Sequence, residues 1–404
     1  MKQKLILTGV LGLVWALAAS EVSTQLRVDL SLRNRALGSA TLEDAPKGTY
    51  GTRGSIESRG IGAAGCSETG ELSTNQGPIY VDAECGALAW EFRLKPYPVE
   101  GVMASDQLSW YSEAPTWWII SEGDVILRRL DTSGTPGVAF LLNDQPLKVG
   151  AGPRSLPALD QAPGFWLLGE PAHVDRGSVR HFFDRETIPQ HLAGVLDSHS
   201  AGIGYLLEAL PHTELSPVFW MGLAQWQLSV GGAAGTGLVL ANYPLRAQDF
   251  DRNAHAITLY VVLHEHAHHL FDTPVPLWIG ESLASYLAIK AMKETSPELY
   301  PVVDDVFIAP GFALEAPLSV LGERADAGDG KAYMQLYMGA AFWMALDDAV
   351  GKQGVQGGFL RVLPELVARG FAPGGSPRPD VIAQVTRLTR ESLNPILDRY
   401  LAPQ

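Results

Sequence analysis

The sequence predicts an α+β protein in which an N-terminal β-rich domain precedes a mainly helical domain. Short segments with period-two alternation occupy the first 150 residues, and long apolar runs with helical spacing follow residue 255. A length of 404 residues exceeds one compact core and suits two domains or one large one. We expect the boundary in the Gly- and Pro-rich stretch 150–163, which gives domains at 21–150 and 151–404.

Residues 1–20 have the features of a signal peptide. Lys2 and Lys4 precede a largely apolar run from Leu5 to Ala19, and small residues stand where cleavage would occur. The apolar run is short for a membrane anchor. We therefore expect export, to a periplasm or to the extracellular medium, and no stable membrane span after cleavage.

The composition argues against several classes of protein. Hydrophobic residues make up 46% and charged residues 18% of the chain, as in globular proteins. The formal net charge of −14 argues against a nucleic-acid partner. Two cysteines are too few for a disulfide scaffold or a cysteine-zinc site. In an oxidising compartment, Cys66 and Cys85 are expected to form a structural disulfide.

The expected elements of the first domain are strands, because apolar and polar residues alternate or short β-type runs lie between turn residues. These segments are 26–32, 87–94, 117–120 and 125–127. Further strands are expected at 219–230 and 237–241, on either side of a glycine-rich turn at 231–235. Helices are expected later in the chain, at 255–271, 279–294, 331–350, 356–369 and 378–400, with a loop at 301–330.

The helix expected at 255–271 carries the pattern His-Glu-x-x-His. His264 and His268 are four residues apart, so they share one face of a helix and can bind one metal. Glu265 lies between them, where it can take a proton from a water molecule. A catalytic zinc needs a third protein ligand, which must be a carboxylate or an earlier histidine because no histidine follows His269. The best candidate is Glu281, with 12 residues between it and His268.

These residues resemble the gluzincin metallopeptidases of the thermolysin-like clan. The resemblance is carried by the His-Glu-x-x-His helix, by Pro-Leu-Trp-Ile-Gly-Glu-Ser-Leu-Ala-Ser-Tyr at 276–286, and by the later segment 332–347. The glycyl-aminopeptidase-like, peptidase MA-like branch is nearest, since it also places a β domain first. The resemblance implies a thermolysin-like catalytic domain at 151–404 that hydrolyses peptides or proteins. It further implies one Zn²⁺ per chain, bound by His264, His268 and Glu281, with Glu265 as general base.

In the aminopeptidase branches of this clan, a tyrosine on the later helix stabilises the transition state. Tyr333 matches the Tyr-x-Gln/Lys pattern and is favoured here, while Tyr337 lies nearer the following glycine. Asp272 and Ser285 are candidates to orient the ligand histidines. Two departures stand out: Ser282 replaces the usual glycine, and segment 231–235 lacks the acidic residue that often binds a substrate amine. Aminopeptidase specificity is therefore not implied.

Other interpretations of the histidine-rich helix stay open. His266 points away from the face of His264 and His268, and is expected at the surface or beside the ligands. Glu265 and His269 form a second i, i+4 pair that could hold a metal. The protein could instead be a degenerate peptidase that keeps zinc and acts as a non-catalytic binding or envelope-assembly module. A third hypothesis is a secreted β-domain binding protein whose histidine-rich helix holds no metal.

Overall fold

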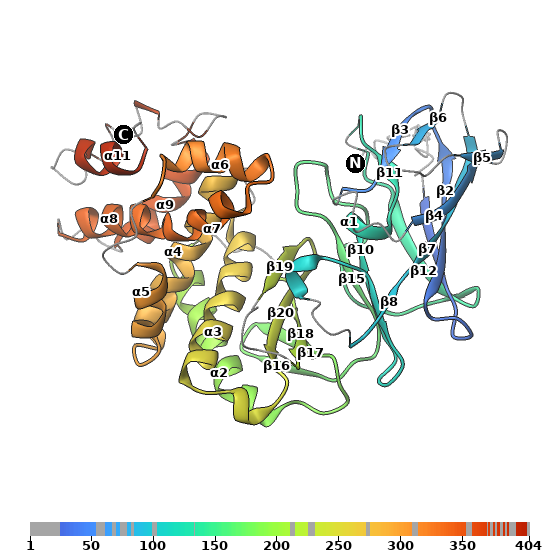
Figure 1. The fold of residues 1–404 in the computed structure, drawn as a ribbon, viewed down its shortest axis with the longest axis horizontal. Helices are drawn as coiled ribbons and strands as arrows, with labels where there is room; N and C mark the ends of the chain where they lie inside the picture. The colour runs from blue at the N-terminus through green and yellow to red at the C-terminus, as the bar shows by residue number, and fades with distance from the viewer. Residues whose placement is uncertain are drawn as a thin grey trace, which may run out of the picture.

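The computed structural model describes residues 25–53, 61–66, 70–72, 79–81, 85–98, 103–132, 134–210, 215–224, 231–271, 275–308, 314–352, 358–369 and 393–401, with isolated positions between 371 and 387. The expected signal peptide, residues 1–20, lies outside the described residues. Figure 1 shows a β-rich part on one side, a helical part on the other, and a mixed sheet between them. The predicted order, a β-rich region followed by a mainly helical one, is confirmed.

The β-rich part begins with a seven-stranded sheet in the order β13-β12-β1-β2-β7-β4-β5. The strands predicted at 26–32 and 87–94 are β1 (Gln25–Leu30) and β7 (Cys85–Arg93), whose alternate side chains are buried. The other strands are β2 (Leu37–Ala45), β4 (Ile61–Cys66), β5 (Gly70–Leu72), β12 (Gly137–Leu142) and β13 (Gln145–Pro146). A three-stranded sheet adds β11 (Arg128–Arg129), β3 (Gly48–Gly51) and β6 (Ile79–Val81).

The predicted disulfide is present and joins two neighbouring strands of the large sheet. Cys66 ends β4 and Cys85 begins β7, and their Cα atoms are 5.7 Å apart. The two strands are antiparallel partners, in which Cys66 lies opposite Leu88. The bond therefore links strands that the sheet already holds together.

A five-stranded sheet, ordered β14-β15-β10-β9-β8, follows in the β-rich part. The strand predicted at 117–120 is β10 (Trp117–Ser121), which pairs with β15 (Phe165–Gly169). The strand predicted at 125–127 is wrong, because Glu122–Val125 form the one-turn helix α1. Buried carboxylates hold this turn: Glu122 accepts from the Gly164 amide at 2.7 Å and Asp124 from the Ser109 amide at 2.8 Å. The other strands are β8 (Lys95–Pro96), β9 (Trp110–Ser112) and β14 (Val149–Ala151).

The mixed sheet has the order β16-β17-β18-β20-β19 and begins with β16 (His173–Arg176). Its central strands β17 (Val179–Phe183), β18 (Val218–Leu223) and β20 (Leu238–Pro244) are parallel, so their carboxyl ends meet at one edge. The glycine-rich segment predicted as a turn is instead the edge strand β19 (Gly232–Gly235), antiparallel to β20. The turn lies at Gly237, whose φ of +86° suits glycine.

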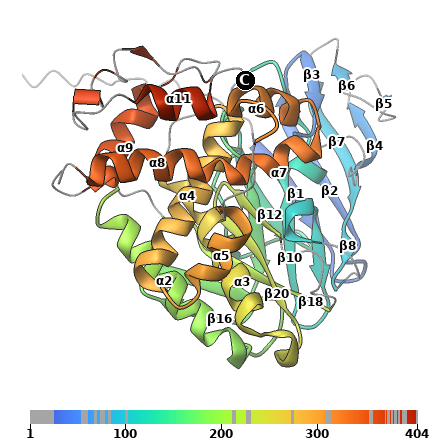
Figure 2. The ribbon, with the colours of Figure 1, turned by 60° about the vertical axis from the view of Figure 1, so that its left-hand side comes forward.

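The helical part is built around α3 (Arg252–Ala267) and α4 (Leu277–Thr295), which correspond to the helices predicted at 255–271 and 279–294. A 3₁₀ turn, His268–Leu270, continues α3. Both helices contact α2 (Ala193–Leu207), and α3 also packs on β20. Figure 2 shows α7 (Gly330–Met338) and α8 (Ala340–Gly351) running across α4.

Two helix predictions need correction. The segment 301–330, expected as loop, contains α5 (Tyr300–Phe307) and α6 (Leu318–Asp326), because Pro301 and Pro317 lie at helix starts, where their missing amide is tolerated. The helix expected at 331–350 is divided into α7 and α8 at Gly339. A Cβ there would come within 2.7 Å of the Cβ of Ser282, so the chain turns where it touches α4.

The helix predicted at 356–369 is α9 (Gly358–Arg369). Most of the segment 378–392 lies outside the described residues, and α11 (Asn394–Tyr400) forms the end of the helix predicted at 378–400. Among the described residues, no helix combines the length and the apolar character needed to cross a bilayer.

Within the described part of the chain, three apolar clusters form the core, one in the β-rich part, one in the helical part and one between sheets. The third cluster packs β10 and β15 against the mixed sheet through residues such as Trp117, Phe165 and Phe219. The rings of Trp117 and Phe219 contact edge to face, with centroids 4.9 Å apart. The mixed sheet therefore packs on the β-rich part through the same apolar cluster.

Candidate metal centre

Helix α3 presents the two histidines of the His-Glu-x-x-His pattern. The helix begins at a side-chain cap, where Asp251 accepts a hydrogen bond from the Ala254 amide at 2.8 Å. The residues in the middle of the helix are mostly buried, because α3 packs against α4 and against β20. His264 lies in its last turn with 3% of the side chain exposed, and His268 begins the 3₁₀ turn with 24% exposed.

Helix α4 brings Glu281 to the same place. It follows Pro276 and is anchored by Trp278, whose indole is fully buried. A Cβ on Gly322 would lie 3.0 Å from the Cβ of Trp278, so α6 packs directly against this anchor. One turn after Trp278, Glu281 is buried and faces α3.

The three side chains converge on one point. The Nε2 atoms of His264 and His268 are 3.2 Å apart. Oε2 of Glu281 lies 3.2 Å from Nε2 of His264 and 3.8 Å from Nε2 of His268. One donor atom from each of the three residues lies within 4.8 Å of the others. Two imidazole nitrogens and one carboxylate oxygen are the donor set of a catalytic zinc site.

The charge states of these groups fit a divalent cation. Burial opposes ionisation of Glu281, but the hydrogen bond with His264 and the positive charge that His268 carries at low pH lower its pKa to about 2. Burial lowers the pKa of His268 to about 4, so its imidazole is neutral at pH 7. A carboxylate beside a neutral imidazole offers lone pairs to a metal. The residues present therefore fit Zn²⁺.

A short hydrogen-bonded chain lies behind His264. Oγ of Ser285 is 3.1 Å from Nδ1 of His264, and the hydroxyl of Tyr260 donates to Oγ of Ser285 at 3.0 Å. A proton on Nδ1 that donates to Ser285 leaves Nε2 with a free lone pair, as a metal ligand requires. Ser285 was a candidate for this role from the sequence, whereas Asp272 lies outside the described residues. Tyr260 was missed, although its position four residues before His264 was a signal.

Glu265 lies beside the ligands and under the edge strand β19. A Cβ on Gly232 would come within 2.4 Å of Cγ of Glu265, so only glycine fits at this position. Burial raises the pKa of Glu265 to about 7, and the charge of Glu281 contributes in the same direction. A carboxyl with a pKa near neutral can both accept and return a proton.

Both candidate tyrosines of α7 lie at the centre. The hydroxyl of Tyr333 donates to Oε1 of Glu281 at 3.1 Å. The ring of Tyr337 contacts the ring of His264, with centroids 5.0 Å apart. The two tyrosine rings also meet edge to face at 5.6 Å. Burial raises the pKa of both hydroxyls, so each remains a hydrogen-bond donor at neutral pH.

The other histidines of the motif take different places. His266 is fully buried on the opposite side of α3, so the surface position considered for it is wrong. Its Nε2 is 2.7 Å from the carbonyl of Ser216, and its Nδ1 is 3.0 Å from Nε2 of His199. Among the described residues, the His264, His268 and Glu281 group alone has metal-donor geometry. The alternative pair of Glu265 and His269 does not belong to such a group.

Comparison with known proteins supports the fold. No protein-family profile matches the chain, and no match is found among curated proteins. Among solved structures, the chain is similar to an aminopeptidase N family protein from Idiomarina loihiensis, with a TM-score of 0.61 and 12% sequence identity. The similarity covers 94% of this chain and 76% of that one. At this identity it shows that the chain shares a fold with an aminopeptidase N family protein.

Proposed function

We propose that this protein is an exported, zinc-dependent metallopeptidase that hydrolyses peptide bonds. The observation that carries the proposal is the convergence of His264, His268 and Glu281, with Glu265 next to them on the same helix. A structural zinc site has no need of this glutamate. The fold shared with an aminopeptidase N family protein supports the same class.

The roles of the side chains follow from their positions. His264, His268 and Glu281 would hold Zn²⁺, which lowers the pKa of a bound water and polarises a carbonyl group. Glu265 takes the proton of the attacking water and passes it to the leaving amine. Tyr333 donates a hydrogen bond to the oxyanion of the tetrahedral intermediate, and Tyr337 supports it from one helical turn away.

The edge strand β19 supplies a surface for an extended substrate. It is the last strand of the mixed sheet, and its Gly232 lies against Glu265. A peptide added as a further strand would be held by backbone hydrogen bonds beside the general base. The side chains of Gly232–Gly235 are small, so they add little steric hindrance to an extended peptide of varied sequence.

The replacement of glycine by Ser282 does not favour a non-catalytic protein. Oγ of Ser282 accepts a hydrogen bond from Nε1 of Trp343 at 2.8 Å, and its Cβ packs against Gly339. The side chain is fully buried between α4 and α8. The serine side chain therefore contributes a hydrogen bond and packing contacts between α4 and the junction of α7 and α8.

Export is proposed from two features. Residues 1–20 have signal-peptide character. The Cys66–Cys85 disulfide suits an oxidising compartment.

The decisive experiment measures zinc and hydrolysis together in three variants. The wild type should contain one zinc per chain and cleave members of a peptide library. Glu281→Ala should lose zinc, and Glu265→Gln should keep zinc but lose hydrolysis by about 10²-fold or more. Glu294→Ala, on the exposed part of the same helix α4, is the matched control and should change neither.

The outcomes separate the hypotheses. Zinc without hydrolysis in the wild type would favour the degenerate binding module. A wild type that neither contains zinc nor takes it up would contradict both the peptidase and the zinc-binding module.

A further inference from the structure

The chain at the start of the edge strand β19 lies between two parts of the molecule. On one face, Gly232 lies against Glu265 of α3, as described above. On the other face, Gly231 meets Ser105 of the 3₁₀ turn Ala104–Asp106, which belongs to the β-rich part (Figure 1). A Cβ on Gly231 would come within 2.6 Å of Oγ and 3.0 Å of Cβ of Ser105. Two successive glycines therefore leave only backbone between this turn and Glu265.

A buried asparagine joins the turn to the mixed sheet. Asn242 of β20 is fully buried, and its Oδ1 accepts a hydrogen bond from the Ala104 amide at 2.9 Å. Its Nδ2 donates to the carbonyl of Met221 on β18 at 3.2 Å. Its backbone amide donates to the carbonyl of Gly231 at 3.0 Å. One residue thus links the turn, β18 and β20 with the start of β19.

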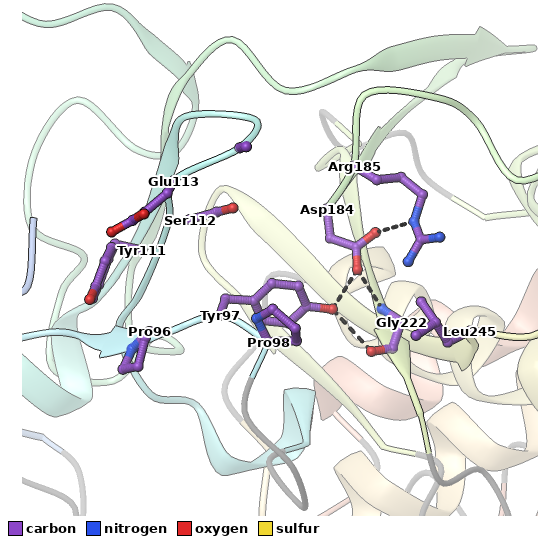
Figure 3. A pocket seen from close by; sticks show the side chains of 11 residues that line it. Pro96, Tyr97, Pro98, Tyr111, Ser112, Glu113, Asp184, Arg185, Gly222 and Leu245 are labelled. Carbon is purple, nitrogen blue, oxygen red and sulfur yellow. Dashed lines mark hydrogen bonds and ion pairs between the residues drawn. The ribbon is translucent and has the colours of Figure 1, made fainter.

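The turn is also held by its neighbours along the chain. Before the turn, the hydroxyl of Tyr97 donates to Asp184 and to the carbonyl of Gly222, the latter at 3.0 Å. Figure 3 shows this contact at the edge of a cavity of about 370 Å³, which Arg185 also lines. After the turn, Leu108 is buried in the apolar cluster between the sheets. Polar and apolar contacts therefore fix the turn relative to the mixed sheet.

The edge strand depends on such a support. β19 pairs with β20 and has no second partner strand, so fewer backbone hydrogen bonds hold it than hold a central strand. A displacement of β19 away from the turn would move Gly232 towards Glu265, where no space is left. The position of Glu265 relative to a peptide on β19 is therefore sensitive to the turn.

We propose that the 104–106 turn of the β-rich part positions β19, and through it Glu265, for catalysis. Ser105 is a positioning residue that acts through Gly231. The inference rests on the proposed function, since Glu265 acts as a general base only in a peptidase. It adds that the β-rich part, which contributes none of the three metal-donor residues, is needed for full activity.

A pair of substitutions tests the contact. Gly231→Ala places a methyl group against Ser105, and the φ of Gly231 is not positive, so its backbone accepts alanine. We expect kcat/KM for peptide hydrolysis to fall by about ten-fold or more, mainly through kcat, with zinc content unchanged. Ser105→Gly alone should lower it less. The double variant lacks the Oγ and Cβ that the methyl would meet, so most of the loss in kcat should be recovered.

Gly137→Ala, at the start of β12, is the matched control, since nothing lies within 4 Å of its Cβ position. It should leave kcat and KM unchanged. Wild-type kinetics in Gly231→Ala would overturn the proposal, and so would a loss in Gly231→Ala that persists in the double variant.

Hydrogen exchange provides a readout that needs neither zinc nor hydrolysis. In the zinc-free protein, the amides of 232–244 should exchange several-fold faster in Gly231→Ala than in the wild type, and return towards the wild-type rate in the double variant. If the wild type cleaves no peptide, the proposed function fails, and these rates alone decide whether the turn positions β19. Unchanged rates in Gly231→Ala would overturn that positioning.

Folding of the variants is itself informative. If Gly231→Ala does not fold, the double variant should fold, because the same contact is relieved. Failure of both variants to fold would overturn the proposal.

Discussion

At the scale of single residues, the centre combines groups whose environments push their pKa values apart. Glu281 is held ionised beside two imidazoles, while burial raises the pKa of Glu265 to about 7 although it directly follows His264 on α3. One carboxyl is thereby suited to bind a metal and the other to move a proton. The tyrosines differ in a similar way, since the Tyr333 hydroxyl contacts Glu281 while the Tyr337 ring covers His264.

Removing one hydroxyl group at a time distinguishes the proposed roles of Tyr333 and Tyr337. We expect Tyr333→Phe to lower kcat by about 10²–10³-fold with zinc retained, because it removes a donor to the oxyanion. Tyr337→Phe keeps the ring on His264 and should lower kcat less. Steady-state kinetics measures kcat of both variants, and elemental analysis measures their zinc content. A larger loss in Tyr337→Phe would reverse the two roles.

At the scale of elements, the position of Glu265 depends on the edge strand β19 as well as on α3. The strand approaches so closely that Gly232 has no room for a side chain above Glu265. Helix α3 and strand β19 therefore determine together where Glu265, the proposed general base, lies. The glycine-rich composition that suggested a turn reflects this close approach.

A methyl group at residue 232 tests this contact. We expect Gly232→Ala to lower kcat/KM by about ten-fold or more, because a small displacement of a catalytic group is costly, while zinc content stays unchanged. Gly204→Ala, on α2, is the matched control, since nothing lies within 4 Å of its Cβ position. Wild-type kinetics in Gly232→Ala would show that β19 does not constrain the base.

At the scale of the whole molecule, buried histidines link stability to pH. His181 on β17 is fully buried, and its Nδ1 accepts a hydrogen bond from Nε1 of Trp220 at 3.0 Å. Burial lowers its pKa to about 4, from about 6.5 in an unfolded chain. The unfolded state therefore binds more protons between these values, so stability is complete above pH 6.5 and is lost as the pH falls towards 4.

Asparagine at residue 181 keeps an acceptor for Trp220 and does not titrate. Between pH 7 and pH 5, we expect the free energy of unfolding of His181→Asn to fall by about 2 kcal/mol less than that of the wild type. Urea unfolding at the two pH values measures the difference. His173→Asn, at an exposed position on β16, is the control and should follow the wild type. If the free energy of unfolding falls by the same amount in His181→Asn and in the wild type, His181 is not the source of the pH dependence.

The sequence by itself determined what depends on short-range spacing. A separation of four positions places His264 and His268 on one helical face, and period-two and helical patterns indicated a β-rich part before a helical one. Local sequence patterns predicted secondary structure less well where buried polar groups or tight contacts outweigh the intrinsic helix or strand propensity. The helix α1, held by buried Glu122 and Asp124, and the break between α7 and α8 at Gly339 are two such places.

Tertiary structure decided which distant segments meet. The approach of Glu281 and Tyr333, the contact of Gly232 with Glu265, and the cavity beside Arg185 each join residues from separate elements. These contacts depend on how helices and strands pack, and many pairings are compatible with the same local pattern. Spacing along the chain therefore identifies the chemical groups, and packing determines which of them act together.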